Sequence, residues 1–82
     1  MKLFTVHDSK AELFLNPMTF RNAGDALRAF ETTVNDPQSQ FHKFPDDFTL
    51  VEIASYDQDC GIIKPHDAHV ILANASTFIN KD

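Results

Sequence analysis

The alternation of apolar and polar residues predicts two short strands near the N-terminus. Residues 2–8, KLFTVHD, place Phe4 and Val6 on one side of a two-residue period, which is typical of a strand. A turn signal, DSK, separates this stretch from residues 11–15, AELFL, and so short a connection favours an antiparallel hairpin. Pro17 has no amide proton, so we expect it to end the second strand or to lie on a sheet edge.

A helical period follows in residues 22–37, NAGDALRAFETTVNDP. Phe30 and Val34 belong to one apolar stripe along this segment. Asn22 is the expected N-cap, because its side-chain oxygen can accept a hydrogen bond from a free amide of the first turn. Pro37 ends the helix, since the residue before a proline is driven out of the α region.

The second half of the chain predicts a loop and a strand pair. Residues 38–47 are expected to form an ordered loop, and residues 47–57, DFTLVEIASYD, the strongest strand. Its apolar residues occur at both even and odd positions and so lie on both faces of the strand. This pattern indicates either a strand covered on both faces or a bulge. After the turn DQDCG, residues 62–64 begin a return strand, PHD interrupts it, and residues 69–75, HVILANA, resume it. The tail, residues 76–82, either packs through Phe78 and Ile79 or frays.

This order, ββαββ, predicts an α+β fold with a small, mostly antiparallel sheet of about four strands and one helix packed on one face. A length of 82 residues allows one domain, residues 1–82. Cys60 is the only cysteine, so no internal disulfide can support so small a core.

The charge balance limits the classes of partner. Seven Lys and Arg residues stand against twelve Asp and Glu residues, a formal net charge of −5. This disfavours tight nonspecific binding to phosphates, which needs many cationic contacts. The net charge still allows a local basic patch. The start, MKLFTVHDSK, lacks the apolar core of a signal peptide, and no stretch approaches the roughly 20 apolar residues of a membrane span. We therefore expect a soluble intracellular protein without a membrane partner.

Candidate catalytic and metal-binding residues are few. His66 and His69, in HDAH, would share a face on a helix and could bind zinc, but in a β-rich segment they are expected on opposite faces. Cys60 lies among acids rather than beside the cation or helix N-terminus that activates a thiol. The adjacent acids Asp46 and Asp47 precede a strand, as solvated surface residues commonly do. We predict a protein that is not an enzyme and that has no metal site and no cofactor.

Three phenylalanines punctuate the central loop at spacings of three and four: Phe41, Phe44 and Phe48. Exposed rings beside a cation such as Lys43 can stack on the bases of single-stranded nucleic acid. The alternative, favoured in so small a domain, is that these rings fasten the loop to the sheet and the helix.

Residues 28–57, RAFETTVNDPQSQFHKFPDDFTLVEIASYD, resemble a region of the small nonstructural protein of gokushovirus-type microviruses, which are single-stranded-DNA phages. The matching features are ALRAF, VNDP, the pattern F-x-K-x-P-[DE]-D-[FY]-T-L, and an acid-bearing strand that ends in an aromatic residue and Asp. FTVHDSKAE, residues 4–12, fits the same family, and the resemblance covers about residues 1–73. The chain departs from the family at ASYD, residues 54–57, where the family has a glycine followed by Phe and Asp.

The resemblance implies a nonstructural phage protein made in the cytoplasm of the infected bacterial host. Some members are described as DNA-binding, and they are compared with the microvirus protein that switches replication from duplex DNA to the packaging of single-stranded genomes. The resemblance carries over no catalytic residues.

We therefore expect a non-enzymatic accessory protein in viral single-stranded-DNA synthesis or packaging. It would act through viral or host replication proteins, and any DNA binding would be weak. One alternative is a host-directed protein that inhibits or redirects a host factor, and another is a small hydrolase or metal protein.

If DNA is bound, the expected residues are the cations and one ring, namely Lys10, Arg21, Arg28, Lys43 and Phe44. A homodimer is also expected. The last predicted strand, HVILANA, is a sheet edge with no lysine and no proline, and such edges tend to pair. The predicted contact is a sheet edge or an aromatic face near the C-terminal half.

Overall fold

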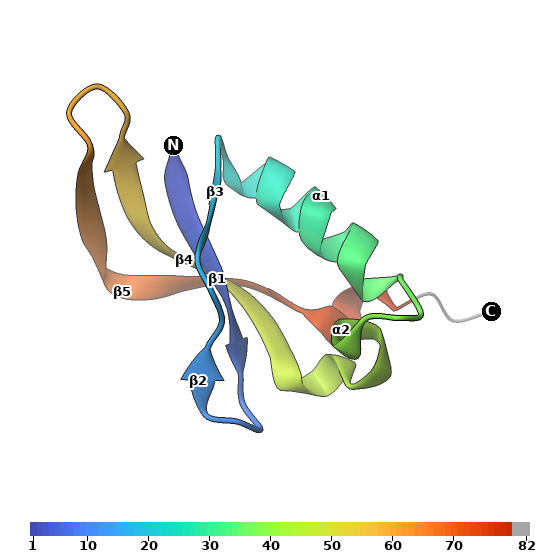
Figure 1. Ribbon diagram of the computed structural model, residues 1–82. Helices are drawn as coiled ribbons and strands as arrows, with labels where there is room; N and C mark the ends of the chain where they lie inside the picture. Colours follow the sequence, from blue (N-terminus) through green and yellow to red (C-terminus); the bar gives the residue numbers. More distant parts are fainter. Residues whose placement is uncertain (80–82) are drawn as a thin grey trace.

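The computed structural model describes residues 1–79 and has an antiparallel sheet with one main helix on one side (Figure 1). The elements, in chain order, are β1 (Lys2–Asp8), β2 (Leu13–Phe14), β3 (Met18–Phe20), α1 (Ala23–Val34), α2 (Gln40–Lys43), the 3₁₀ turn η1 (Pro45–Asp47), β4 (Phe48–Asp57), β5 (Ile62–Asn74) and the 3₁₀ turn η2 (Ala75–Phe78). The strand order is β2-β1-β4-β5, and β3 also pairs with β1. The predicted fold class is confirmed, with five strands in the described chain instead of four.

The second predicted strand is shorter than expected. The amides of Lys10 and Ala11 both donate to Oδ1 of Asp8, at 3.0 and 3.1 Å, so these residues form a turn and β2 begins only at Leu13. The chain then passes Pro17 and pairs with β1 again as β3, a strand that was not predicted. Pro17 lies on the sheet edge, as predicted, and divides the outer strand into two short pieces.

The helix has its predicted position. Oδ1 of Asn22 accepts a hydrogen bond from the amide of Asp25 at 2.8 Å, which is the expected N-cap. Ala26, Phe30 and Val34 are buried at helical spacing, so the predicted apolar stripe packs on the sheet.

The prediction of a loop for residues 38–47 is wrong in part, because α2 and η1 occupy most of it. The side chain of Ser39 accepts from the amide of Phe41 at 3.0 Å and starts the single turn of α2. Pro45 stands at the start of η1, where its missing amide proton costs no hydrogen bond.

The predicted interruption at PHD is wrong, since β5 is one strand from Ile62 to Asn74. Within residues 1–79 β5 pairs with β4 alone, and Pro65 is tolerated on this outermost strand. The register shifts between Leu50 and Val51 and again between Glu52 and Ala54. The bulge predicted as one explanation for the mixed apolar pattern is therefore present.

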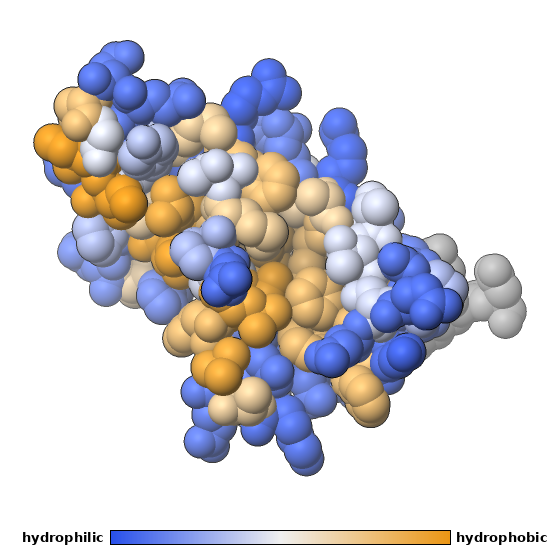
Figure 2. All heavy atoms as spheres, in the orientation of Figure 1, coloured by the Kyte–Doolittle hydropathy of each residue, from blue (hydrophilic) through white to orange (hydrophobic). Residues whose placement is uncertain are grey.

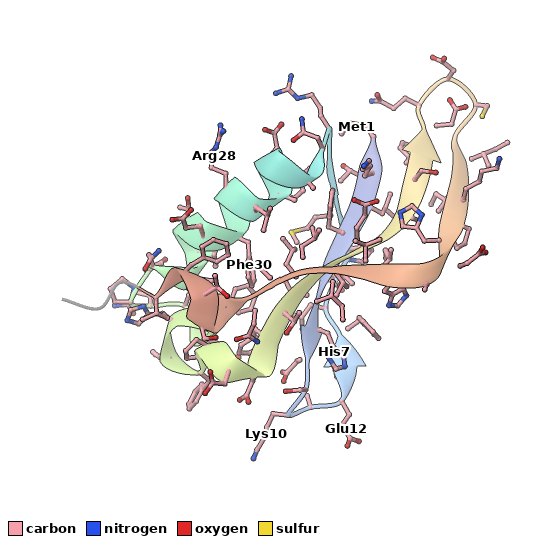
Figure 3. All side chains as sticks on the ribbon, turned by 180° about the vertical axis from the view of Figure 1, so that it is seen from behind. Met1, His7, Lys10, Glu12, Arg28 and Phe30 are labelled. Carbon is pink, nitrogen blue, oxygen red and sulfur yellow. The ribbon has the colours of Figure 1, made fainter. Side chains whose placement is uncertain are left out.

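The core lies between α1 and one face of the sheet. Phe4 and Val6 of β1, Leu50 of β4, and Phe30 and Val34 of α1 are all buried there. Phe30 points from the helix toward the strands (Figure 3). From the tail, Phe78 and Ile79 pack against this core, and residues 80–82 lie outside the described chain.

Candidate functional site

Two shallow depressions lie on the side of the sheet away from the core, and together we call their linings the uncovered face. The first has a volume of about 250 Å³ and the second about 330 Å³. The lining residues are His7, Phe14, Thr49, Val51, His69 and Ile71 in the first, and Leu3, Pro17, Thr19, Tyr56 and Ile63 in the second. None of them is Asp, Glu, Lys or Arg.

Strand alternation and register explain why these residues share a face. Leu3 and His7 stand four apart on β1 and point to the side opposite Phe4 and Val6. The register then sets Phe14 of β2 beside His7, and residues directly opposite in an antiparallel pair share a face. On β4 and β5 the same rule places Val51 beside Ile71.

Three rings meet at the first depression. The centroids of His7 and Phe14 are 4.6 Å apart, and those of Phe14 and His69 are 5.3 Å apart in an edge-to-face arrangement. Val51 is only 4% exposed, whereas Ile71 at the rim is 74% exposed. The depression thus has a buried apolar floor and an accessible apolar rim.

An apolar cleft opens on the other side, between α1 and the β2–β3 segment, with a volume of about 440 Å³. Its lining combines sheet and helix residues: Val6, Leu15, Asn16, Pro17, Met18, Phe20, Ala26, Ala29, Phe30, Thr33, Phe41 and Leu50. Met18 is 39% exposed. In Figure 2 hydrophobic residues gather in the middle of the molecule, where β3 and α1 face each other in Figure 1. The lining again has no formally charged residue.

The cations predicted to contact DNA come from separate parts of the fold. Lys10 is in the β1–β2 turn beside Glu12, and Arg28 projects from α1 on another side of the molecule (Figure 3). Nη2 of Arg21 lies 3.1 Å from Oδ2 of Asp25, so part of its charge is locally balanced. Lys10 and Arg28 therefore do not belong to one basic patch.

Lys43 and Phe44 are brought together at the end of α2, but with acids around them. They line one shallow hollow with Pro45, Asp46 and Asp47. Phe44 is 59% exposed, so its ring is accessible for stacking. The carboxylates of Asp46 and Asp47 line the same hollow as this ring, and they oppose an approaching phosphate.

The other two loop phenylalanines belong to the core. Phe48 is buried, and the centroid of Phe41 lies 4.7 Å from that of Phe48 and 5.5 Å from that of Phe30. Of the two explanations for the aromatic loop, core packing describes Phe41 and Phe48, while Phe44 alone points outward.

A cluster of polar side chains around one buried carboxylate was not predicted from the sequence. Glu52 is 7% exposed, and its Oε2 accepts from Nε2 of His66 at 2.7 Å, while Nζ of Lys2 lies 3.6 Å from Oε1. A lone acid inside the apolar run TLVEIA was the one available signal, because a buried carboxylate needs a partner. His66 and His69 do point to opposite faces, since His69 lies against Phe14.

The β4–β5 turn holds one perturbed acid. The amide of Asp59 donates to Oδ1 of Asp57 at 2.9 Å, and this bond, followed by the thiol of Cys60, lowers the pKa of the Asp57 carboxyl.

Within residues 1–79 no three His, Cys, Asp or Glu side chains are placed to hold a metal ion. None of the helices of that part of the chain is long and apolar enough to cross a membrane.

Residues 1–78 match the family described as Phage ORF5 protein. The chain is also 30% identical over 83 residues to Protein ORF5 of Chlamydia phage 1, an alignment that covers 95% of this chain and 86% of that protein. No solved structure matches. The molecule is therefore a bacteriophage protein, and the chain belongs to the Phage ORF5 protein family. The resemblance to gokushovirus-type microviruses is confirmed, since Chlamydia phage 1 is a gokushovirus.

Proposed function

We propose that this phage protein is a non-enzymatic accessory protein that acts in viral single-stranded-DNA synthesis or packaging. It works in the cytoplasm of the infected bacterial host by contacting viral or host replication proteins. The apolar cleft between β3 and α1 receives the partner.

The cleft is the observation that carries this proposal. Its volume of about 440 Å³ falls in the range of sites that accept ligand groups, and its lining is almost wholly apolar. Contiguous exposed apolar surface commonly marks a site of protein interaction. Met18 at the cleft is accessible to a partner side chain.

The charge distribution favours protein over nucleic acid as the main partner. The net charge is −5, Arg21 is paired with Asp25, and Lys43 lies beside Asp46 and Asp47. Nonspecific DNA affinity comes from several cations that neutralise phosphates together. DNA contacts in this proposal are therefore weak and secondary.

Affinity capture from infected cells tests the proposal. Tagged wild-type protein is compared with Met18→Lys, which places a charge at the cleft, and with Phe44→Lys, which places the same charge at an exposed ring outside it. Each sample is processed with and without nuclease. A viral or host replication protein should be captured by the wild type and Phe44→Lys, should survive nuclease, and should be lost from Met18→Lys.

Three results would contradict this proposal. Capture that nuclease abolishes would indicate bridging by DNA. Capture that Met18→Lys leaves intact would exclude the cleft. Specific capture of a host protein unrelated to replication would favour the alternative of a host-directed inhibitor.

A further inference from the structure

The uncovered face lacks formal charge, although the chain as a whole is rich in it. Nineteen of the 82 residues are Asp, Glu, Lys or Arg, the sum of twelve acids and seven bases. None of them lines either depression of this face. An antiparallel sheet with one solvated face normally alternates apolar residues inside with polar residues outside. The linings of the two depressions depart from that rule in part, because large apolar side chains stand there beside two threonines and two histidines.

Large apolar side chains stand exposed there. Ile71 is 74% exposed, Ile63 is 52% exposed and Phe14 is 50% exposed. They come from β5 and β2, so exposed apolar groups occur at both ends of the strand order. β4 lies between them and contributes Val51 to the floor.

From these observations we infer that a second copy of this chain packs on the uncovered face across a two-fold axis. Each copy carries a net charge of −5, so two copies repel each other least where neither presents a charge. A two-fold contact brings the same patch of both copies together, and a charge-free apolar patch is complementary to itself. A strongly charged partner would find no ion-pair partner among the residues of this face.

The dimer also accounts for a feature of the sequence. β4 carries apolar residues on both parities, with Leu50 toward the core and Val51 toward the uncovered face. Bulges explain part of that pattern. A second copy would bury the apolar residues of β4 that face away from the core. The cleft between β3 and α1 opens on the other side of the sheet and shares only Pro17 with the uncovered face, so this inference does not depend on the proposed function.

A sheet edge is the competing mode of association. The β1 side of the sheet ends in β2 and β3, which have two and three residues and are separated by Pro17. β5 is longer, but it carries Lys64, Pro65 and Asp67 in its first half and two shifts of register. Charges, prolines and bulges all hinder edge pairing. The face is therefore favoured over the edge.

Light scattering on a sizing column over a range of concentrations tests the inference. The wild type should reach twice the mass of one 9.3 kDa chain as concentration rises. Ile71→Lys and Phe14→Lys should each stay at the mass of one chain, because each places a like charge on both sides of the contact. Ile62→Lys is the matched control, since Ile62 is 55% exposed on β5 outside both depressions, and it should dimerise like the wild type.

Circular dichroism at the lowest concentration verifies that each variant is folded. If a lysine variant fails to fold, Ile71→Ser or Phe14→Ser replaces it. A wild-type mass of one chain at every concentration would overturn the inference. So would a dimer that survives Phe14→Lys but not Ile71→Lys, because that pattern indicates pairing along the β5 edge.

Discussion

The ring of Phe14 meets the ring of His69 edge to face with centroids 5.3 Å apart, although β2 and β5 stand at opposite ends of the strand order. Strands three places apart in a flat sheet are separated by roughly 14 Å. The contact therefore requires the sheet to curl toward its uncovered face. The bulges in the β4–β5 pair provide this curvature, since a bulge bends its strand and increases the local twist.

Removal of the Phe14 ring should destabilise the curled sheet. Phe14→Ala eliminates the contacts with His7 and His69 and exposes the floor at Val51. The ring is half exposed, so we expect a loss of about 1–2 kcal/mol in the free energy of unfolding. Urea denaturation at a concentration where the protein is monomeric measures it, and a loss above about 4 kcal/mol would show that the ring is a core element.

The phenylalanines of the central segment should divide into two classes. Phe41→Ala removes a ring packed between Phe30 and Phe48 and should cost about 3 kcal/mol in the free energy of unfolding. Phe44→Ala, the matched control, removes a ring that is 59% exposed and should change it by less than about 1 kcal/mol. Thermal melts of the two variants compare them directly. Equal melting temperatures would contradict the assignment of Phe41 to the core.

The buried carboxylate should make a measurable contribution to stability. Glu52→Ala leaves His66 and Lys2 without their shared acceptor, and because both side chains reach solvent we expect a loss of about 1–3 kcal/mol in the free energy of unfolding. Glu52→Gln keeps an acceptor for His66 and should lose less. Chemical denaturation near neutral pH checks the order of the variants. A Gln variant less stable than the Ala variant would contradict a role as hydrogen-bond acceptor.

Local patterns in the sequence were sufficient for the elements that depend on neighbouring residues. The strand over residues 2–8 and the helix capped by Asn22 were predicted because period and cap lie within a few residues of one another. β3 was missed because three residues after Pro17 are too short for a period, and they become a strand only by pairing with β1.

The candidate sites were less accessible to prediction. The pairing of Glu52 with His66 depends on a shift of register between β4 and β5, which no local pattern encodes. The grouping of His7, Phe14 and His69 depends on curvature of the whole sheet. Candidate DNA-binding residues were chosen by type, and their separation in space is a property of the topology.

DNA binding should be weak. The net charge is −5, Lys10 and Arg28 lie on different sides of the molecule, and Arg21 is paired with Asp25, so few phosphates can be neutralised together. At about 150 mM salt the dissociation constant for a single-stranded oligonucleotide should be micromolar or weaker, and it should rise steeply with added salt. Fluorescence anisotropy provides the measurement. Nanomolar affinity at that salt concentration would contradict the charge argument.

The most direct test of the proposed function is the ratio of single-stranded to duplex viral DNA in infected cells. Phage carrying Met18→Lys is compared with wild-type phage and with phage carrying Phe44→Lys, after melts have shown that both variants fold. The account predicts that Met18→Lys lowers the ratio several-fold, because the cleft no longer accepts its partner, and that Phe44→Lys leaves it unchanged. An unchanged ratio with the Met18→Lys phage would contradict a role for the cleft in single-stranded-DNA synthesis or packaging.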